Sequence, residues 1–164
     1  MPAVKNRLQD VKIDIKASAR EALVEILNQA LADTADLTSQ FKQAHWNVRG
    51  MDFWQFHQMF DAIHEALEPF VDELAERINT LGGVAMGTVR MAASSSSLKE
   101  FPNGFGDSKK FTTELRDRLA AYAKKTREAI DEAEKQEDAT TADLFTEISR
   151  AADLQLYFLE SHLH

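Results

Sequence analysis

Residues 45–76 read HWNVRGMDFWQFHQMFDAIHEALEPFVDELAE, and this segment combines the spacing of a long helix with several potential metal ligands. The candidates are two imidazoles and three carboxylates: His45, His57, Asp61, Asp72 and Glu76. Nitrogen and oxygen donors in this mixture suit iron or manganese, with zinc as a further alternative, better than they suit calcium. The segment therefore predicts a transition-metal site.

The apolar residues of this segment recur at helical spacing and predict one helix over residues 53–81. His57 and Asp61 are four residues apart and share a face of that helix, as do Asp72 and Glu76. The centres of the two pairs are separated by roughly 22 Å along the helix, at about 1.5 Å per residue. A transition metal contacts ligand atoms at only about 2 Å. One straight helix therefore cannot close both pairs around one ion.

Two arrangements are compatible with this separation of the two ligand pairs. Either the two pairs are unrelated, or a second copy of the helix runs antiparallel across a two-fold axis that passes near Ala66 and Leu67. In the second case the His57 end of one chain meets the Asp72 end of the other. A two-fold interface is self-complementary and creates two identical sites. We take the shared site as the central hypothesis.

The composition of the 164-residue chain limits its class. This length suits one domain with a sizeable core. The absence of cysteine excludes disulfides, thiolate catalysis and cysteine-ligated zinc. No apolar run is long enough to span a membrane, and the N-terminus lacks the apolar region of a signal peptide. We therefore expect a cytoplasmic protein without membrane contact, with association with the nucleoid as an alternative.

Charge is distributed unevenly along the chain. The net charge is −8, but residues 1–20 hold five basic and two acidic residues. Residues 1–17 are polar and mixed, and we predict a flexible N-terminal arm there, followed by one domain over residues 18–164. Such an arm on an acidic body predicts weak, salt-sensitive contact with phosphates.

Helical spacing recurs beyond the central segment and predicts an all-α protein. Ser18 with Glu21 reads as a capping box, Asp52 reads as the next helix cap, and Pro69 should kink the central helix. The Gly82-Gly83 pair should end that helix. The predicted helices cover residues 19–47, 53–81, 108–136 and 140–162, with a short helix near 95–101 inside the crossover 84–107. This order favours a four-helix bundle with one long crossover.

Four short motifs, KQAHWNVRG, FHQMFD, DELAER and LGG, resemble the Dps family, the ferritin-like "DNA-binding protein from starved cells" proteins. The segment TADLFTEISRAADLQLYFLESHL resembles the last helix of that family. The resemblance implies a ferritin-like four-helix bundle with a short helix in the crossover between the second and third helices. It also implies a homo-dodecamer that forms a hollow shell for ferric mineral.

The same resemblance implies a ferroxidase. Ferrous iron would be oxidised by hydrogen peroxide, or more slowly by O₂, at di-iron-type sites on two-fold interfaces, which protects DNA from oxidative damage. One subunit would supply His45, His57 and Asp61, and the other would supply Asp72 and Glu76. Ordinary ferritins use a Glu-x-x-His motif within each bundle, and this sequence contains none.

Other residues have roles that the resemblance suggests or leaves open. Trp46 adjoins the site and either intercepts stray oxidising equivalents or serves as an interface aromatic. Acidic residues near the last interhelical junction are candidates for a three-fold pore that concentrates ferrous ions, and the alternative is a solvated charge run. These pore candidates are Glu134, Asp138 and Asp143. His64 and Glu68 also lie on the ligand stripe, where we expect structural or interface roles.

Two other classes of function compete with iron oxidation. The first is a structural protein that compacts the nucleoid by binding DNA, although the short arm has acids among its basic residues. The second is a metal-free helical interaction module. Iron uptake separates both classes from a ferroxidase.

Overall fold

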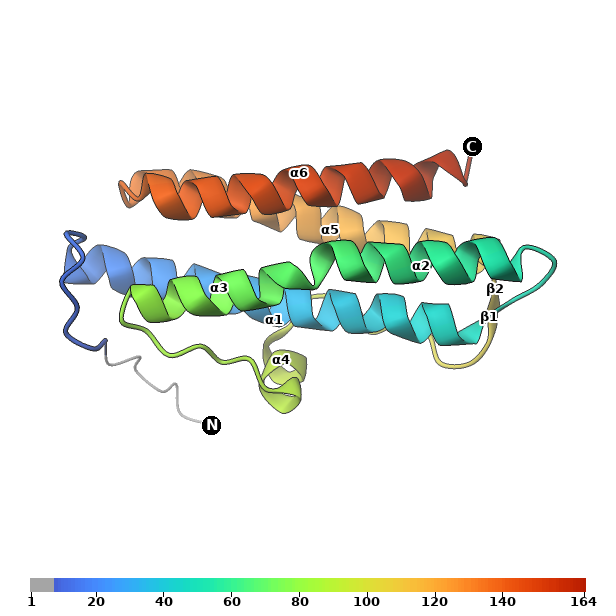
Figure 1. The fold of residues 1–164 in the computed structure, drawn as a ribbon, viewed down its shortest axis with the longest axis horizontal. Helices are drawn as coiled ribbons and strands as arrows, with labels where there is room; N and C mark the ends of the chain where they lie inside the picture. Colours follow the sequence, from blue (N-terminus) through green and yellow to red (C-terminus); the bar gives the residue numbers. More distant parts are fainter. Residues whose placement is uncertain (1–7) are drawn as a thin grey trace.

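The computed structural model describes residues 8–164 and consists mainly of helices (Figure 1). In chain order the elements are α1 (Ala17–Asn47), β1 (Val48–Arg49), α2 (Phe53–Leu67), α3 (Pro69–Thr80), α4 (Val89–Ser95), β2 (Gly106–Asp107), α5 (Ser108–Lys135) and α6 (Ala139–Ser161). Figure 1 shows α2 and α3 nearly end to end, so that they complete a four-helix bundle with α1, α5 and α6. The all-α bundle predicted from the sequence is confirmed. No helix of the described part is long and apolar enough to cross a membrane.

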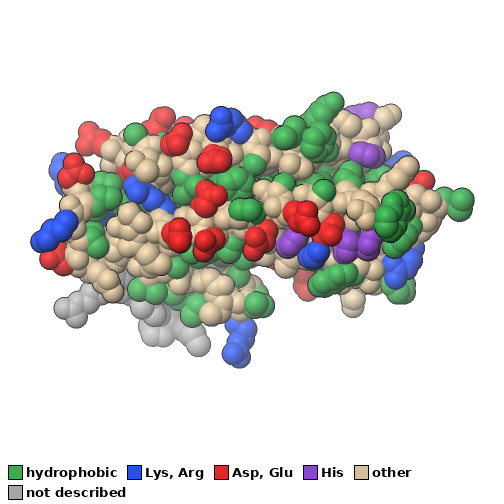
Figure 2. Space-filling model, viewed as in Figure 1, with side chains coloured by type: hydrophobic (Ala, Val, Ile, Leu, Met, Phe, Trp, Pro, Cys, Tyr) green, Lys and Arg blue, Asp and Glu red, His purple; other side chains and the backbone are tan. Residues whose placement is uncertain are grey.

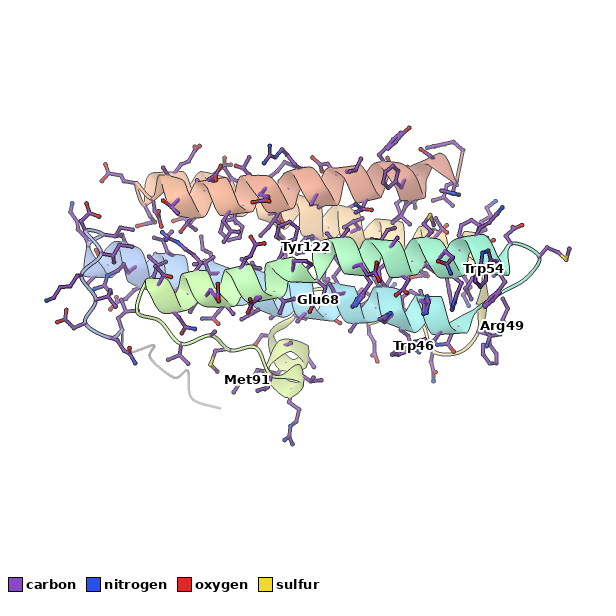
Figure 3. All side chains as sticks on the ribbon, viewed as in Figure 1. Trp46, Arg49, Trp54, Glu68, Met91 and Tyr122 are labelled. Atoms are coloured by element: carbon purple, nitrogen blue, oxygen red, sulfur yellow. The ribbon has the colours of Figure 1, made fainter. Side chains whose placement is uncertain are left out.

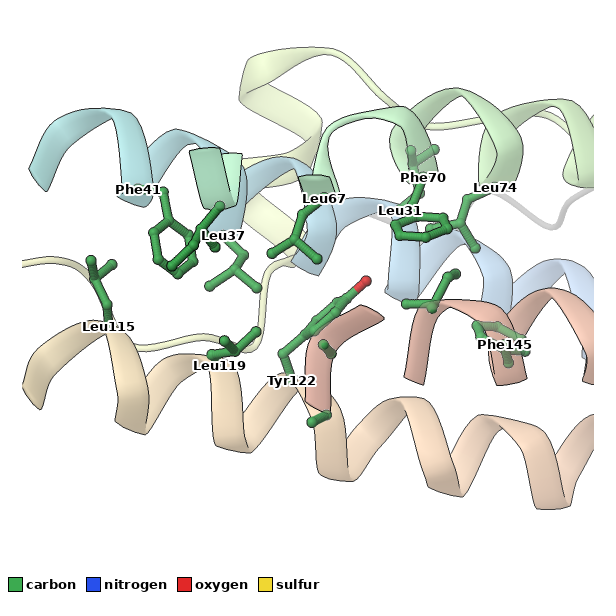
Figure 4. Packing of buried hydrophobic residues seen from close by; sticks show 14 of the residues in the cluster. Leu31, Leu37, Phe41, Leu67, Phe70, Leu74, Leu115, Leu119, Tyr122 and Phe145 are labelled. Carbon is green, nitrogen blue, oxygen red and sulfur yellow. The ribbon is translucent and has the colours of Figure 1, made fainter. Parts of the chain in front are cut away.

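The core lies between the four long rods and consists of aliphatic and aromatic side chains (Figure 4). Phe41 of α1, Leu67 of α2 and Leu115 of α5 are fully buried in it. Tyr122 brings a hydroxyl group into this apolar core (Figure 4). Its oxygen lies 2.8 Å from Oγ1 of Thr34. Burial raises the pKa of Tyr122 above its usual range, so the hydroxyl stays protonated.

The sequence predicted one helix over residues 53–81 with a kink at Pro69, and the structure interrupts the helix at this residue. α2 ends at Leu67 and α3 begins at Pro69, whose ring nitrogen cannot donate the helical hydrogen bond. Glu68 between them keeps helical torsion angles, with φ −58° and ψ −39°. The rod therefore continues in nearly the same direction, and its polar residues stay on one side of the bundle.

The short crossover helix lies at residues 89–95, so the predicted position at 95–101 is wrong. Thr88 caps this helix by accepting a hydrogen bond from the N–H of Met91. Ser96 and Ser97 do not extend it, because their hydroxyls and the Ser97 N–H donate to aspartates of α1, including Asp33. Tertiary hydrogen bonds thus end the helix where local sequence preference would have continued it.

Two predicted helix caps are also corrected. α1 begins at Ala17 with Lys16 as its N-cap residue and no side-chain cap, so the Ser18–Glu21 box is wrong. Asp52 occupies the N-cap position of α2, but its side chain accepts no hydrogen bond from that helix. Its carboxylate instead accepts a 3.4 Å hydrogen bond from the Ser108 hydroxyl at the start of α5.

The segment before α1 lies against the end of the bundle at which α3 stops. Of the predicted arm, residues 1–7 lie outside the described residues. The N–H of Gln9 donates to the carbonyl of Gly82 at 2.8 Å, and Arg20 donates to the carbonyl of Leu81 at 2.9 Å. Gly82 has φ +82°, and a Cβ there would lie 2.8 Å from the Gln9 oxygen. Glycine is therefore required where α3 ends.

An ion pair joins the end of α3 to the α5–α6 junction. Arg77 Nη2 lies 2.7 Å from Asp138 Oδ2, and both side chains are largely buried, at 12% and 3% exposure. Asp138 Oδ1 also accepts hydrogen bonds from the N–H groups of Thr140 and Thr141 and so caps α6. Burial raises the pKa of Asp138, but the hydrogen bonds from Thr141 and Arg77 outweigh it and leave the pKa lowered.

We predict that Arg77→Met lowers the free energy of unfolding by about 3 kcal/mol, because it leaves a buried carboxylate without its cation. Arg127→Met is the matched control, because Arg127 and its partner Asp153 are both half exposed. This variant should lower the free energy of unfolding by less than about 1 kcal/mol. Urea unfolding at fixed protein concentration measures both. Because the pKa of Asp138 is lowered, this stabilisation exists above its unfolded pKa of about 3.9. It is lost as the pH falls through the folded pKa.

Candidate metal centre

The two predicted histidine ligands face each other across the contact between α1 and α2. His45 lies in the last turn of α1 and His57 in the second turn of α2. Their rings stack with centroids 3.7 Å apart and planes 19° from parallel. Residues twelve positions apart in the chain are thus brought together by the turn at residues 48–52.

Reciprocal hydrogen bonds orient these two rings. Nδ1 of His45 lies 2.7 Å from the carbonyl oxygen of His57, and Nδ1 of His57 lies 2.8 Å from the carbonyl oxygen of His45. A carbonyl can only accept, so each Nδ1 carries the proton and donates it. In the neutral ring this leaves the lone pair on Nε2, which is the atom free to bind a metal.

His64 repeats the same arrangement two turns further along α2. Its Nδ1 lies 3.0 Å from the carbonyl oxygen of Thr38 in α1. The side chains of α2 thus use backbone carbonyls of α1 to orient imidazoles at two separate points. The sequence placed His64 on the ligand stripe but carried no signal of this hydrogen bond.

Asp61 lies one turn after His57 and forms an ion pair with Lys42 of α1. The hydrogen bond from Lys42 lowers the pKa of Asp61, and this effect outweighs the burial that raises it. The carboxylate is therefore ionised and available as an anionic ligand at neutral pH. Sequence reasoning missed Lys42, although its position three residues before His45 was the available signal.

Asp72 and Glu76 lie on α3 and are exposed. Neither carboxylate forms an ion pair within residues 8–164. Figure 2 shows acidic side chains along α3 and over part of α2, with histidines also along α2. Nearby Glu73 has its pKa raised, first by burial and then by the charges of Glu147, Asp72 and Glu76. The charges around Glu73 show that negative charge is concentrated on this surface.

A single chain does not gather the five candidate ligands. No cluster of three or more histidine, aspartate or glutamate side chains suited to a metal ion occurs among the described residues. The chain instead presents two partial ligand sets on one face: the histidine set (His45, His57, Asp61) and the acidic set (Asp72, Glu76). Their joining across a two-fold axis stays a prediction.

The remaining candidates lie in two different surroundings. Trp46 is 59% exposed beside the histidine set. Glu134 and Asp143 are exposed near the α5–α6 junction, whereas Asp138 is buried and paired with Arg77. The redox role of Trp46 and the pore roles of the three acids stay predictions.

We predict that Lys42→Met raises the pKa of Asp61 toward its ordinary value, because the variant removes the hydrogen bond and the positive charge that lower it. The measurement is a carboxyl ¹³C NMR titration of metal-free protein labelled at aspartate. Lys125→Met, which removes a lysine 3.9 Å from Asp33, is the control and should leave Asp61 unchanged. An unchanged Asp61 titration in Lys42→Met would show that Lys42 does not govern this carboxylate.

Comparison with known proteins identifies relatives over almost the whole chain. The model of the ferritin-like domain of the Ferritin family matches residues 24–164. A DNA protection during starvation protein of Agrobacterium fabrum is 37% identical over 152 residues, covering 93% of this chain and 94% of the relative. A second protein of that name, from Brevibacillus brevis, is 27% identical over 151 residues, or 91% of this chain and 99% of the relative.

Solved structures agree in fold. DpsC from Streptomyces coelicolor is 28% identical with a TM-score of 0.91, covering 96% of this chain and 92% of its own. Dps from Microbacterium arborescens in the high iron form is 30% identical with a TM-score of 0.82, covering 88% of this chain and 94% of its own.

Proposed function

The chain belongs to the Dps family of ferritin-like proteins, and from this membership we propose that it oxidises ferrous iron and stores the ferric product. Iron is the substrate, hydrogen peroxide is the preferred oxidant and O₂ a slower one. The active assembly is a homo-dodecamer with a hollow interior. The structure of the Microbacterium arborescens relative in a high iron form supports iron as the metal.

The observation that carries this proposal is the division of the ligands into two partial sets on one exposed face. In the proposed assembly, the histidine set of one subunit meets the acidic set of its two-fold partner. Each interface then contains two equivalent sites. The free Nε2 atoms of His45 and His57 supply neutral donors, and Asp61, Asp72 and Glu76 supply negative charge.

This ligand set suits the oxidation of iron. Carboxylates stabilise the trivalent product more than the divalent reactant, because the higher charge gains more from anionic ligands. Two ferrous ions each lose one electron, and one peroxide molecule takes both electrons and two protons to give two water molecules. Oxidation in pairs avoids the hydroxyl radical, and Trp46 beside the site intercepts stray oxidising equivalents. Zn²⁺ and Mn²⁺ compete for the same ligands.

Protection of DNA follows from removing ferrous iron and peroxide together, and the name of the Agrobacterium relative supports this outcome. Direct compaction of DNA is the weaker alternative. Arg20, one of the basic residues near the N-terminus, is 9% exposed and donates to the carbonyls of Ile15 and Leu81. Its guanidinium group therefore forms hydrogen bonds within the fold and is not exposed for binding phosphates.

Coexpression of two complementary variants tests the shared site. One chain carries His57→Asn and Asp61→Asn, and the other carries Asp72→Asn and Glu76→Gln. A pair of identical variant chains contains no complete site. A mixed pair contains one complete site and one site that lacks both ligand sets. With random pairing, about one quarter of all sites are intact. Ferric absorbance after peroxide is added to anaerobic ferrous protein should recover to about one quarter of the wild-type rate.

Each variant expressed alone is the control, and both should oxidise iron at the rate of buffer. Light scattering verifies that every preparation assembles. A mixture no faster than either variant alone would contradict the shared site. A wild-type rate equal to that of buffer would contradict the ferroxidase function itself.

A further inference from the structure

A groove with a volume of about 720 Å³ runs along the outer side of α1. Its walls include His64 and Glu68 from the α2–α3 rod, Lys42 and Gln40 from α1, and the loop at residues 100–103. Figure 3 shows Glu68 at the junction of α2 and α3, with Trp46 near the end of α1. Of these groove residues, only Trp46 and Lys42, the partner of Asp61, have a role in the iron site described above.

His64 and Glu68 are the two ligand-type side chains of this groove that lie one helical turn apart. The hydrogen bond from Nδ1 of His64 to the Thr38 carbonyl leaves Nε2 as the unprotonated atom of the neutral ring. Glu68 is exposed and forms no ion pair among the described residues. Lys42, the lysine in the groove wall, is already paired with Asp61. Its charge is therefore largely neutralised.

A buried acceptor in the same groove lacks a donor. Gln40 is 4% exposed, and its Nε2 donates to Asp36 at 3.1 Å and to the Lys99 carbonyl at 3.2 Å. Its Oε1 has no hydrogen-bond partner within the described part of the chain. Buried polar atoms are nearly always satisfied. Gln40 is thus a buried polar residue with an unsatisfied oxygen in the wall of the same groove as His64 and Glu68.

We propose that His64 and Glu68 of two subunits bind one divalent transition-metal ion on the two-fold axis. This inference rests on the antiparallel pairing of the proposed function. Since the axis passes near residues 66–67, His64 lies within about 1.5 Å, measured along the helix axis, of Glu68 of the partner subunit. Two imidazole nitrogens and two carboxylates from the two subunits complete a four-ligand set. Such a set suits Zn²⁺ or Fe²⁺.

The axial ion is distinct from the iron being oxidised. Each iron site is centred about 11 Å away along the rod, at about 1.5 Å per residue. An ion on the axis links the two subunits directly. It stabilises the two-fold pair by mass action, because it binds the paired state and not the separated chains.

Equilibrium dialysis of the assembled, full-length protein against Zn²⁺, followed by metal analysis, tests the axial site. One ion for every two chains means that His64→Asn and Glu68→Gln should each lose about half a Zn²⁺ per chain. Glu65→Gln is the matched control, because it removes the same charge from an exposed neighbour that does not line the groove. It should keep the wild-type stoichiometry.

A second measurement follows dissociation of the two-fold pair on dilution. Zn²⁺ should lower the dissociation constant of wild type and of Glu65→Gln, and should lower it less in the His64→Asn and Glu68→Gln proteins. Equal stoichiometry and equal response in all four proteins would overturn the axial site.

The two proposals fail in different ways. If the coexpressed variants described above recover activity while the zinc stoichiometry is unchanged by His64→Asn, only the axial site is wrong. If coexpression recovers nothing, the antiparallel pairing is wrong and the axial site fails with it.

Discussion

The proposed metal site depends on one geometric constraint: a metal ion binds only atoms that converge on it. The α2–α3 rod holds its two ligand pairs roughly 22 Å apart, and a transition metal reaches about 2 Å. Pro69 interrupts the rod without folding it back, so the chain cannot close this distance by itself. In the proposed function, oxidation of iron is thereby coupled to assembly, because a lone subunit offers only incomplete ligand sets.

The contact between α1 and α2 prepares the histidines before any metal arrives. The carbonyl groups of His45 and His57 each accept from the other ring, and the carbonyl of Thr38 accepts from His64. These bonds use helix carbonyls and fix the proton on Nδ1, which leaves the lone pair of each neutral ring on Nε2. Lys42 holds Asp61 ionised in the same region. The fold thus supplies orientation and charge, and in the proposed assembly the second subunit supplies the missing ligands.

The sequence predicted the long helices, the break at Pro69 and the ligand stripe, because helical periodicity and proline chemistry are local properties. It misplaced the crossover helix, because the serines that should have formed it donate instead to Asp33 and its neighbour on α1. It also missed the Lys42–Asp61 pair and the histidine–carbonyl bonds. The position of Lys42 three residues before His45 placed it near the site, but the contacts themselves depend on how α1 packs against α2.

Diffraction from crystals soaked anaerobically with ferrous iron, recorded on both sides of the iron absorption edge, would locate the iron relative to the subunit interface. If two subunits share each site, anomalous peaks should lie between the histidine set of one chain and Asp72 and Glu76 of a two-fold neighbour. Iron peaks enclosed within a single bundle, with those five side chains facing solvent, would contradict the shared site.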